Sequence, residues 1–226
     1  MSSKQISTTQ EIKYCHYHLG PYLFHTQITP EECQIVLEEG KKCRKKSNDF
    51  RLHLAGHLKE EYRFPDSAPV AAWLKKYIHA YTASFNKWGP QLLNNTNFAL
   101  NALWINYMKA GDFNPPHSHT GDISFVLYPH VPPEIVEENK EHKGRGCGPG
   151  GVAWLHGEGS QFTINVVSCM PKTGDLFIFP ASLQHWVYPF RSNVERVSVS
   201  GNIVMVKNVI QSPDDIKKHK DIKKHK

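Results

Sequence analysis

The chain has 226 residues, of which 39% are hydrophobic and 21% are charged, a composition that excludes a largely disordered protein. This length allows one domain with a substantial core, and we expect a single domain over residues 1–226. The formal net charge is +6, but the last thirteen residues hold six lysines against three aspartates and so account for half of it. Nucleic-acid binding is therefore not expected, and residues 207–226 should form a solvated basic tail.

Cysteine usage and the N-terminal sequence both favour a reducing compartment. The five cysteines are an odd number without the spacing of a metal finger, and the first fifteen residues lack the apolar core of a signal peptide. No apolar run is long enough to cross a bilayer. We expect a cytoplasmic protein without a membrane partner.

Residues 1–96 are expected to be mainly helical and to support the C-terminal half of the chain. In "ITPEECQIVLEEGKKC", Thr29 is a good N-cap, Pro30 suits the first helical position, and Glu32 can close a capping box. This predicts a helix over residues 30–46. A second, longer helix is predicted over residues 69–88, because its apolar residues recur at three-, four- and seven-residue spacing and leave one apolar face.

After residue 96 the pattern becomes extended. Seven or eight short segments are rich in Val, Ile, Phe, Trp and Tyr and are bounded by Gly, Pro, Asn or Asp. The prediction is an α+β fold in which the helices pack on one face of a β-sandwich or barrel formed by residues 97–206. The long connection after "LYP" is rich in Pro, Gly and charge, which leaves both a lid and a plain surface insertion open.

Polar residues interrupt the β-rich region in three places. His117 and His119 in "NPPHSHTGDISFVLYP" have the spacing that puts two side chains on one face of a strand, and Asp122 comes three residues later. His185 comes after a buried strand in "GDLFIFPASLQHWVYPF". Arg196 lies in "ERVSVSGN", in a strand otherwise built for a core, where a guanidinium is costly unless it is paired.

Together these residues indicate a metal site with a carboxylate-binding arginine beside it. Two histidines and one carboxylate that leave open coordination positions are the pattern of non-haem Fe(II) oxygenases. The rigid fork of donors on Arg196 suits a carboxylate, and Ser198, two residues on, points the same way. A dicarboxylate co-substrate would explain both the open coordination positions at the metal and the carboxylate-binding Arg196.

The three motifs, in this order, resemble those of the Fe(II)/2-oxoglutarate-dependent oxygenases. The resemblance is to the prolyl-hydroxylase-like branch and to small members found in marine phages, and it covers roughly residues 97–206. It implies a double-stranded β-helix core of the jelly-roll or cupin-like type, with Fe(II), 2-oxoglutarate and O₂ as its requirements. It further implies C–H hydroxylation, with release of succinate and CO₂, of a peptidyl substrate such as a prolyl residue or of a small molecule. A phage-encoded member would work in the host cytoplasm.

The resemblance also implies roles for individual residues. His117 and His185 would be the first and last metal ligands. Arg196 would pair with the far carboxylate of 2-oxoglutarate, with Ser198 beside it. Tyr107, ten residues before His117, would touch 2-oxoglutarate. Further candidates for the co-substrate pocket are Tyr128, Asn106 and Asn202.

The sequence departs from the family at the second metal ligand. The usual motif is His-x-Asp, whereas His119 fills the Asp position and Asp122 comes three residues later. Strand spacing favours His119, but Fe(II) favours a hard anionic ligand and therefore Asp122. Both alternatives stay open at this stage.

Two other functions are compatible with the same residues. One is a cupin-like metalloenzyme, for instance a three-histidine dioxygenase, that does not use 2-oxoglutarate. The other is a non-catalytic β-sandwich binding module with a degenerate site. The first differs from the oxygenase in what Arg196 does, and the second would hold almost no metal after reconstitution.

Overall fold

A computed structural model describes residues 20–88 and 96–207. The strands of these residues are β1 (Phe24–Gln27), β2 (Glu61–Arg63), β3 (Thr96–Met108), β4 (Asn114–His117), β5 (Ile123–His130), β6 (Val152–Leu155), β7 (Val166–Cys169), β8 (Asp175–Pro180), β9 (Gln184–Val187) and β10 (Arg196–Lys207). Eight of them come after the long helix, as the extended pattern predicts. The short strands β1 and β2 precede it and were not predicted.

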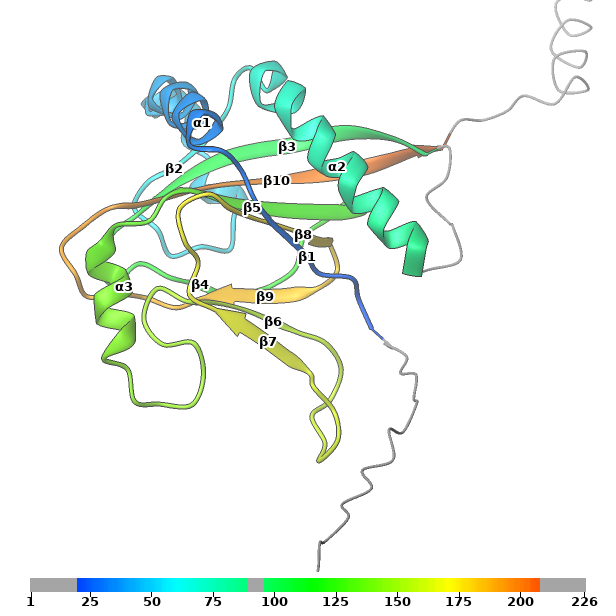
Figure 1. Cartoon of the computed structure of the whole chain (residues 1–226). Coiled ribbons are helices and arrows are strands. Elements are labelled where there is room, and N and C mark those ends of the chain that lie inside the picture. Colours follow the sequence, from blue (N-terminus) through cyan, green and yellow to red (C-terminus); the bar gives the residue numbers. More distant parts are fainter. Residues whose placement is uncertain (1–19, 89–95, 208–226) are drawn as a thin grey trace, which may run out of the picture.

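The strands form two antiparallel sheets (Figure 1). One has six strands in the order β1, β8, β5, β10, β3, β2, and the other has four in the order β4, β9, β6, β7. Strand β10 is central, because it pairs with β3 on one side and with β5 on the other. The predicted α+β fold with a double-stranded β-helix core is confirmed.

The helices are α1 (Pro30–Cys43), α2 (Ala68–Trp88) and α3 (Pro133–Lys140). The capping box of α1 is confirmed, since Glu32 N donates to Thr29 Oγ1 at 3.3 Å and Thr29 N donates to Glu32 Oε2 at 3.0 Å. This helix ends three residues before the predicted end. The carbonyl of Cys43 accepts hydrogen bonds from the Asn48 side chain and the Lys45 backbone, which turns the chain away.

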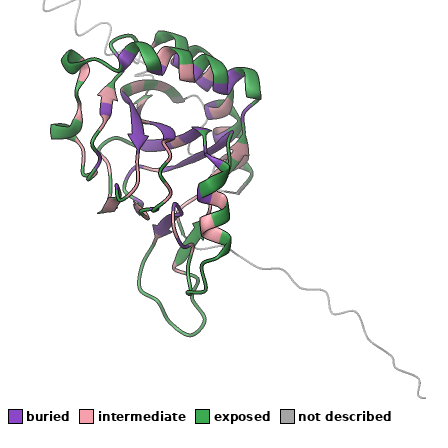
Figure 2. Ribbon diagram, turned by 90° about the vertical axis from the view of Figure 1, so that its left-hand side faces the viewer, coloured by how far each residue is buried: buried purple, intermediate pink, exposed green. Residues whose placement is uncertain are grey.

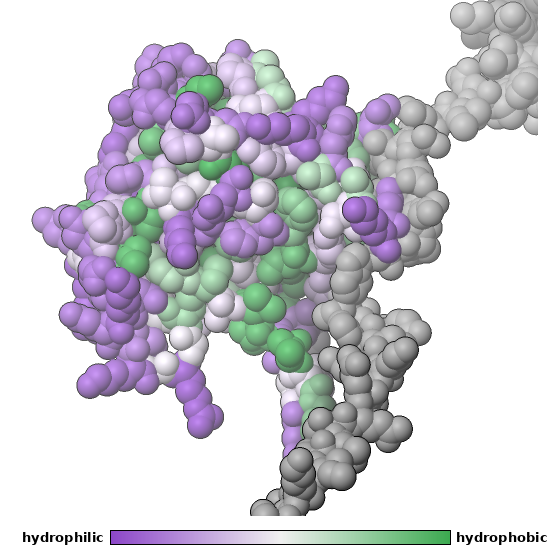
Figure 3. Space-filling model, in the orientation of Figure 1, coloured by the Kyte–Doolittle hydropathy of each residue, from purple (hydrophilic) through white to green (hydrophobic). Residues whose placement is uncertain are grey.

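Helices α1 and α2 cover one face of the six-stranded sheet (Figure 1), while their outer sides stay exposed (Figure 2). The predicted apolar stripe of α2 is buried there through Val70, Leu74, Ile78 and Tyr81. In the orientation of Figure 1, hydrophilic side chains cover much of the outer surface around α1 (Figure 3). The prediction that the helices pack on one sheet is therefore confirmed.

Side chains of the central strands alternate between two environments, as the pleat of a β-strand requires. Those that join the helix-facing core from β3, β5 and β10 are Leu103, Ile105, Tyr107, Ile123, Phe125, Leu127, Val197, Val199 and Ile203. The residues between them point to the space between the two sheets. A second apolar cluster fills part of that space, with Tyr128, Val152, Trp154, Phe177 and Phe179 among its members.

The long connection between β5 and β6 contains α3 and packs against the protein. Ile135 is fully buried in a cluster with Met108 and Phe190. Asn139 Nδ2 donates to the carbonyl oxygens of Cys147 and Pro149 at 2.5 and 2.8 Å. These contacts favour a packed insertion over a lid.

One expectation falls outside the described residues, namely the basic tail over 208–226. Among the residues that the structure describes, no helix combines the length and the apolar character needed to cross a membrane.

Replacing Thr29 by alanine tests the capping box. The variant should lose about 1 kcal/mol of unfolding free energy, because the N-terminal N–H groups of α1 lose their side-chain acceptor. Urea denaturation measures this loss. Thr29→Ser is the matched control, since it keeps the hydroxyl, and equal stability of the two variants would contradict the assignment.

Candidate functional site

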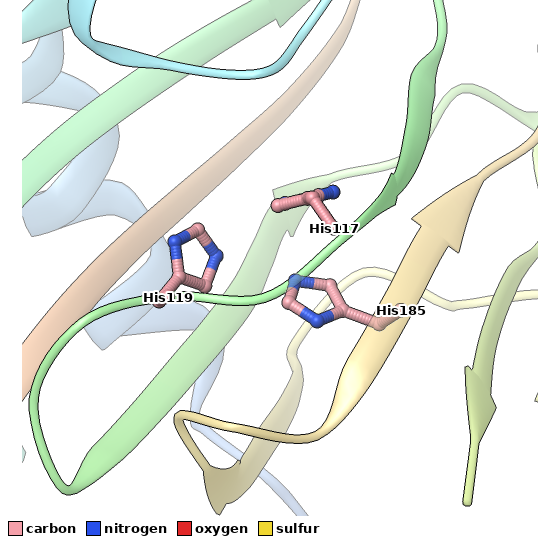
Figure 4. A group of neighbouring side chains, drawn as sticks. All are labelled: His117, His119 and His185. Carbon is pink, nitrogen blue, oxygen red and sulfur yellow. The ribbon is translucent and has the colours of Figure 1, made fainter.

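Three histidine side chains meet between the two sheets (Figure 4). One nitrogen from each of His117, His119 and His185 lies within 4.8 Å of the others. The ring centroids of His117 and His185 are 4.3 Å apart, and that of His119 is 4.9 and 5.0 Å from them. His117 and His185 face each other as register partners of β4 and β9, so strand pairing itself brings these distant residues together.

Two of the imidazoles are oriented by backbone carbonyls. His117 Nδ1 lies 2.7 Å from the carbonyl oxygen of Pro115, and His185 Nδ1 lies 2.9 Å from that of Leu183. A carbonyl only accepts, so each Nδ1 carries the proton and each Nε2 keeps a free lone pair. This is the arrangement in which a histidine ligates a metal through Nε2.

Burial keeps all three rings neutral. Desolvation lowers the pKa of His185 to about 3 and that of His119 to about 4, and His117 adds to both effects. The pKa of His117 is also lowered by burial. Metals bind the neutral imidazole, so the cluster is prepared for a cation over the physiological pH range.

Asp122 does not join the histidines. Its residue is exposed, and its Oδ2 accepts a hydrogen bond from the backbone N–H of Met205 at 2.7 Å. Gly121, with φ of +104°, turns the chain before it, and the Asp122 backbone then bonds to Ile203 and Ala181. Of the two alternatives for the second ligand, the geometry therefore brings only His119 to the cluster.

Arg196 is buried with 1% of its surface exposed. Its Nη1 donates to the carbonyl oxygen of Gly150 at 2.5 Å and its Nη2 contacts Met108 Sδ at 2.7 Å, while its Nε is buried without a partner. No carboxylate among the described residues pairs with it. A buried guanidinium without an anion is costly, and a bound carboxylate would offset that cost.

Polar groups beside Arg196 complete this end of the pocket. The guanidinium carbon lies 5.3 Å from the centre of the Tyr128 ring, and the Tyr128 hydroxyl is buried without a partner. Burial raises the pKa of that hydroxyl well above its usual range, so it remains a donor. Ser198 Oγ accepts from Asn106 Nδ2 at 3.2 Å. Arg196, Tyr128, Ser198 and Asn106 line one pocket with the three histidines.

Two predicted pocket residues lie elsewhere. Tyr107 faces the helices, where the guanidinium carbon of Arg44 lies 4.3 Å from its ring centre, so it does not line the pocket of the histidines. The physical reason is strand alternation, because its neighbours Asn106 and Met108 take the pocket side. Asn202 is buried, but it accepts a hydrogen bond from Ser124 and does not line the pocket.

Sequence reasoning missed one charged member of the pocket. Glu61 lines it, is 1% exposed, and has an Oε2 atom without a partner. Its neighbour Glu60 instead binds Arg44 and Lys109 at the surface. The only signal was strand alternation in "KEEYRF", which sends one of two adjacent glutamates inward but does not say which one.

The buried Glu61 should make stability depend on pH. Desolvation raises the pKa of its carboxyl from about 4.5 to about 7, with Asp112 and Asp49 adding to this and Arg51 opposing it. The folded protein then binds this proton more tightly than the unfolded chain, so the group destabilises the fold increasingly between those two pH values and by a constant amount above them.

Glu61→Gln should therefore gain stability over the wild type as the pH rises. We expect the difference in unfolding free energy, measured on the metal-free protein, to grow by about 2 to 3 kcal/mol between pH 5 and pH 8. For the control Glu60→Gln the difference should stay constant, because hydrogen bonds from Arg44 and Lys109 hold the pKa of Glu60 at about 2. A constant difference for Glu61→Gln would contradict its burial as an unpaired acid.

Comparisons with known proteins agree with this geometry. Residues 102–202 match the model of a family described as "Putative 2OG-Fe(II) oxygenase". Among solved structures, the chain is similar to a prolyl-4-hydroxylase of Pseudomonas putida, with 14% identity, a TM-score of 0.50, and coverage of 79% of this chain and 90% of that one. It is also similar to a viral collagen prolyl hydroxylase from Paramecium Bursaria Chlorella virus-1, solved as a 2OG complex, with 14% identity, a TM-score of 0.52, and coverage of 81% and 96%. A search of curated proteins gives no match. The solved structures share the fold.

Proposed function

We propose that this chain is an Fe(II)/2-oxoglutarate-dependent oxygenase, an enzyme type that requires iron, 2-oxoglutarate and O₂. In this proposal it hydroxylates a C–H bond of a primary substrate and releases succinate and CO₂. The single observation that carries this proposal is the pairing of a neutral three-histidine cluster with a buried, anion-free Arg196 in one pocket. Bound iron and 2-oxoglutarate supply the chemistry, in which O₂ oxidises 2-oxoglutarate and inserts one oxygen atom into the substrate's C–H bond.

In this proposal the residues of the chain bind and orient the iron and the co-substrate, and they exclude water from the pocket. His117, His119 and His185 would hold the iron, since they are neutral and since two of them have an Nδ1 proton fixed on a backbone carbonyl. Three protein ligands leave coordination positions for the co-substrate and O₂. The apolar walls of the pocket, including Val152 and Phe179, keep bulk water from the reacting atoms.

Arg196 would hold the far carboxylate of 2-oxoglutarate. Its Nε has no protein partner, and the Tyr128 hydroxyl offers a further donor close by. Ser198 lies on the same face of β10 as Arg196 and also lines the pocket. These donors in a buried site would bind a carboxylate strongly and specifically.

For the primary substrate, we propose a peptidyl group as the class to test first, with proline as the residue oxidised. The fold shared with prolyl hydroxylases supports this choice. A small-molecule substrate is the alternative.

Metal content tests the ligand set. His119→Ala should lower Fe(II) affinity at least about tenfold, because one of three ligands is removed. Asp122→Asn should leave iron binding unchanged, since the Asp122 carboxylate accepts a hydrogen bond from the backbone N–H of Met205 and does not join the histidine cluster. His119→Asp is the matched variant that keeps a ligand and should retain iron. Loss of iron in Asp122→Asn alone would overturn the three-histidine set.

Arg196→Met tests the co-substrate pocket. We expect 2-oxoglutarate to bind at least about 30-fold more weakly, because a buried carboxylate loses its charged partner. Anaerobic calorimetry of 2-oxoglutarate binding to the iron-loaded protein measures this. The fold should persist, since methionine replaces a buried charge by an apolar group. The exposed Arg191→Met is the control, and equal affinity in both variants would contradict the role.

A further inference from the structure

The pocket has a second polar wall that the proposed function leaves unused. Glu61 Oε2, Asn106 Oδ1 and Asn114 Oδ1 are buried, and none has a hydrogen-bond partner among the described residues. All three residues line the same pocket as the histidines. Buried acceptors without donors are unfavourable, so three of them around one pocket indicate a ligand that brings donors.

Separate elements of the fold bring these acceptors together. Glu61 and Asn106 are register partners on β2 and β3, and Asn114 is the first residue of β4. Asn106 Nδ2 is engaged by Ser198 Oγ, which leaves Asn106 Oδ1 as the free end of the amide. We call Glu61, Asn106 and Asn114 the acceptor wall. Its three residues come from strands of both sheets, so strand pairing positions them.

Gly56 leaves the space into which two members of the acceptor wall point. A Cβ atom at residue 56 would lie 2.3 Å from Asn114 Oδ1 and 2.8 Å from Glu61 Oε1. Both oxygens therefore lie close to the same point and close to each other. The segment 54–61, which carries Gly56 and Glu61, lies beside the chain that leads into β4, because His57 pairs with Phe113. Gly56, Glu61 and His117 line the same pocket, so the acceptor wall and the candidate metal site share one space.

The carboxyl group of the acceptor wall has no cationic partner in the protein. No lysine, arginine or histidine forms an ion pair with Glu61 among the described residues, although Glu60 next to it binds both Arg44 and Lys109. A buried carboxylate without a cation is costly, and a cationic ligand would offset that cost.

From this geometry, and resting on the proposed function, we propose that Glu61, Asn106 and Asn114 bind a protonated amine or a guanidinium of the primary substrate, next to the C–H bond that is hydroxylated. An ammonium offers three donors and a guanidinium five, and neither has an acceptor to oppose the three oxygens. A hydroxyl or a carboxylate would place its own lone pairs against them. Sites built to pair a polar group also reject analogues that lack it, which makes Glu61 a specificity-determining residue.

The test compares cations with neutral isosteres of the same shape. Propylguanidinium and propylurea form one pair, and propylammonium and 1-propanol form another. Each is titrated by calorimetry, without oxygen, into wild-type protein loaded with Fe(II) and 2-oxoglutarate. A capped tripeptide with a central arginine and its citrulline counterpart form a third pair, which tells a peptide source of the cation from a free amine or guanidine.

We expect at least one cation to bind the wild type at least about tenfold more tightly than its neutral partner. In Glu61→Gln, which keeps the shape and removes the charge, the preference should fall below about threefold. The control Glu60→Gln should keep the full preference, because its side chain binds Arg44 and Lys109 away from the pocket. Gly56→Ala should also weaken the binding of the cations, since its methyl group fills the space beside Asn114 Oδ1 and Glu61 Oε1.

Three results would overturn the proposal. The first is that the wild type binds none of the cations. The second is that the cations bind the wild type no more tightly than their neutral isosteres do. The third is that Glu61→Gln keeps the preference for the cation over its neutral isostere. Failure of the proposed function has a different signature, because the loading titrations would then show no binding of Fe(II) or 2-oxoglutarate before any probe is added.

Discussion

The two-residue period of β3, β5 and β10 is the constraint on which the rest of the structure depends. Every second side chain of these strands enters the core under α1 and α2, and the others face the space between the sheets. A shift of one residue in any of the three would exchange the two sets of side chains of that strand, and in β10 it would bury Arg196 under the helices. The long register of β10 with β3 and β5 prevents that shift. Strand pairing thus fixes the chemistry of the pocket.

The pocket holds a buried guanidinium and a buried carboxyl group that do not pair with each other. Arg196 and Glu61 both line it, yet Arg196 bonds to a backbone carbonyl and a thioether, and Glu61 has no cationic partner. Each placement costs stability in the empty protein, because a buried charge loses its hydration. Ligands of opposite charge at the two ends would offset both costs. In the two proposals above, this separation of the two groups would orient the co-substrate and the primary substrate relative to each other.

The histidine cluster lacks the carboxylate that usually accompanies two histidines at such an iron. The reason lies in the turn at Gly121, whose positive φ directs the chain so that Asp122 bonds to the backbone of β10 instead. His119 takes the inner position, with its ring 5.4 Å from that of Trp104. The net charge of the cluster is therefore one unit more positive than that of a site with two histidines and one aspartate.

The sequence by itself determined most of the elements and most of the polar residues of the site. Periodicity predicted both N-terminal helices and seven or eight strands after them, but not β1, β2 or α3, because local propensity and burial act over a few residues. Spacing and motif order pointed to His117, His185 and Arg196, which the structure brings into one pocket.

Only the tertiary structure decided which face each residue takes and which neighbour it meets. Tyr107 and Asn106 differ by one position, and register with β10 sends Asn106 to the pocket and Tyr107 to the helices. The turn at Gly121 decided that His119 and not Asp122 joins the histidine cluster. Glu61 lines the pocket because the short strand β2 pairs it with Asn106, forty-five positions further along the chain. Such contacts join residues far apart in the chain, and no local pattern encodes them.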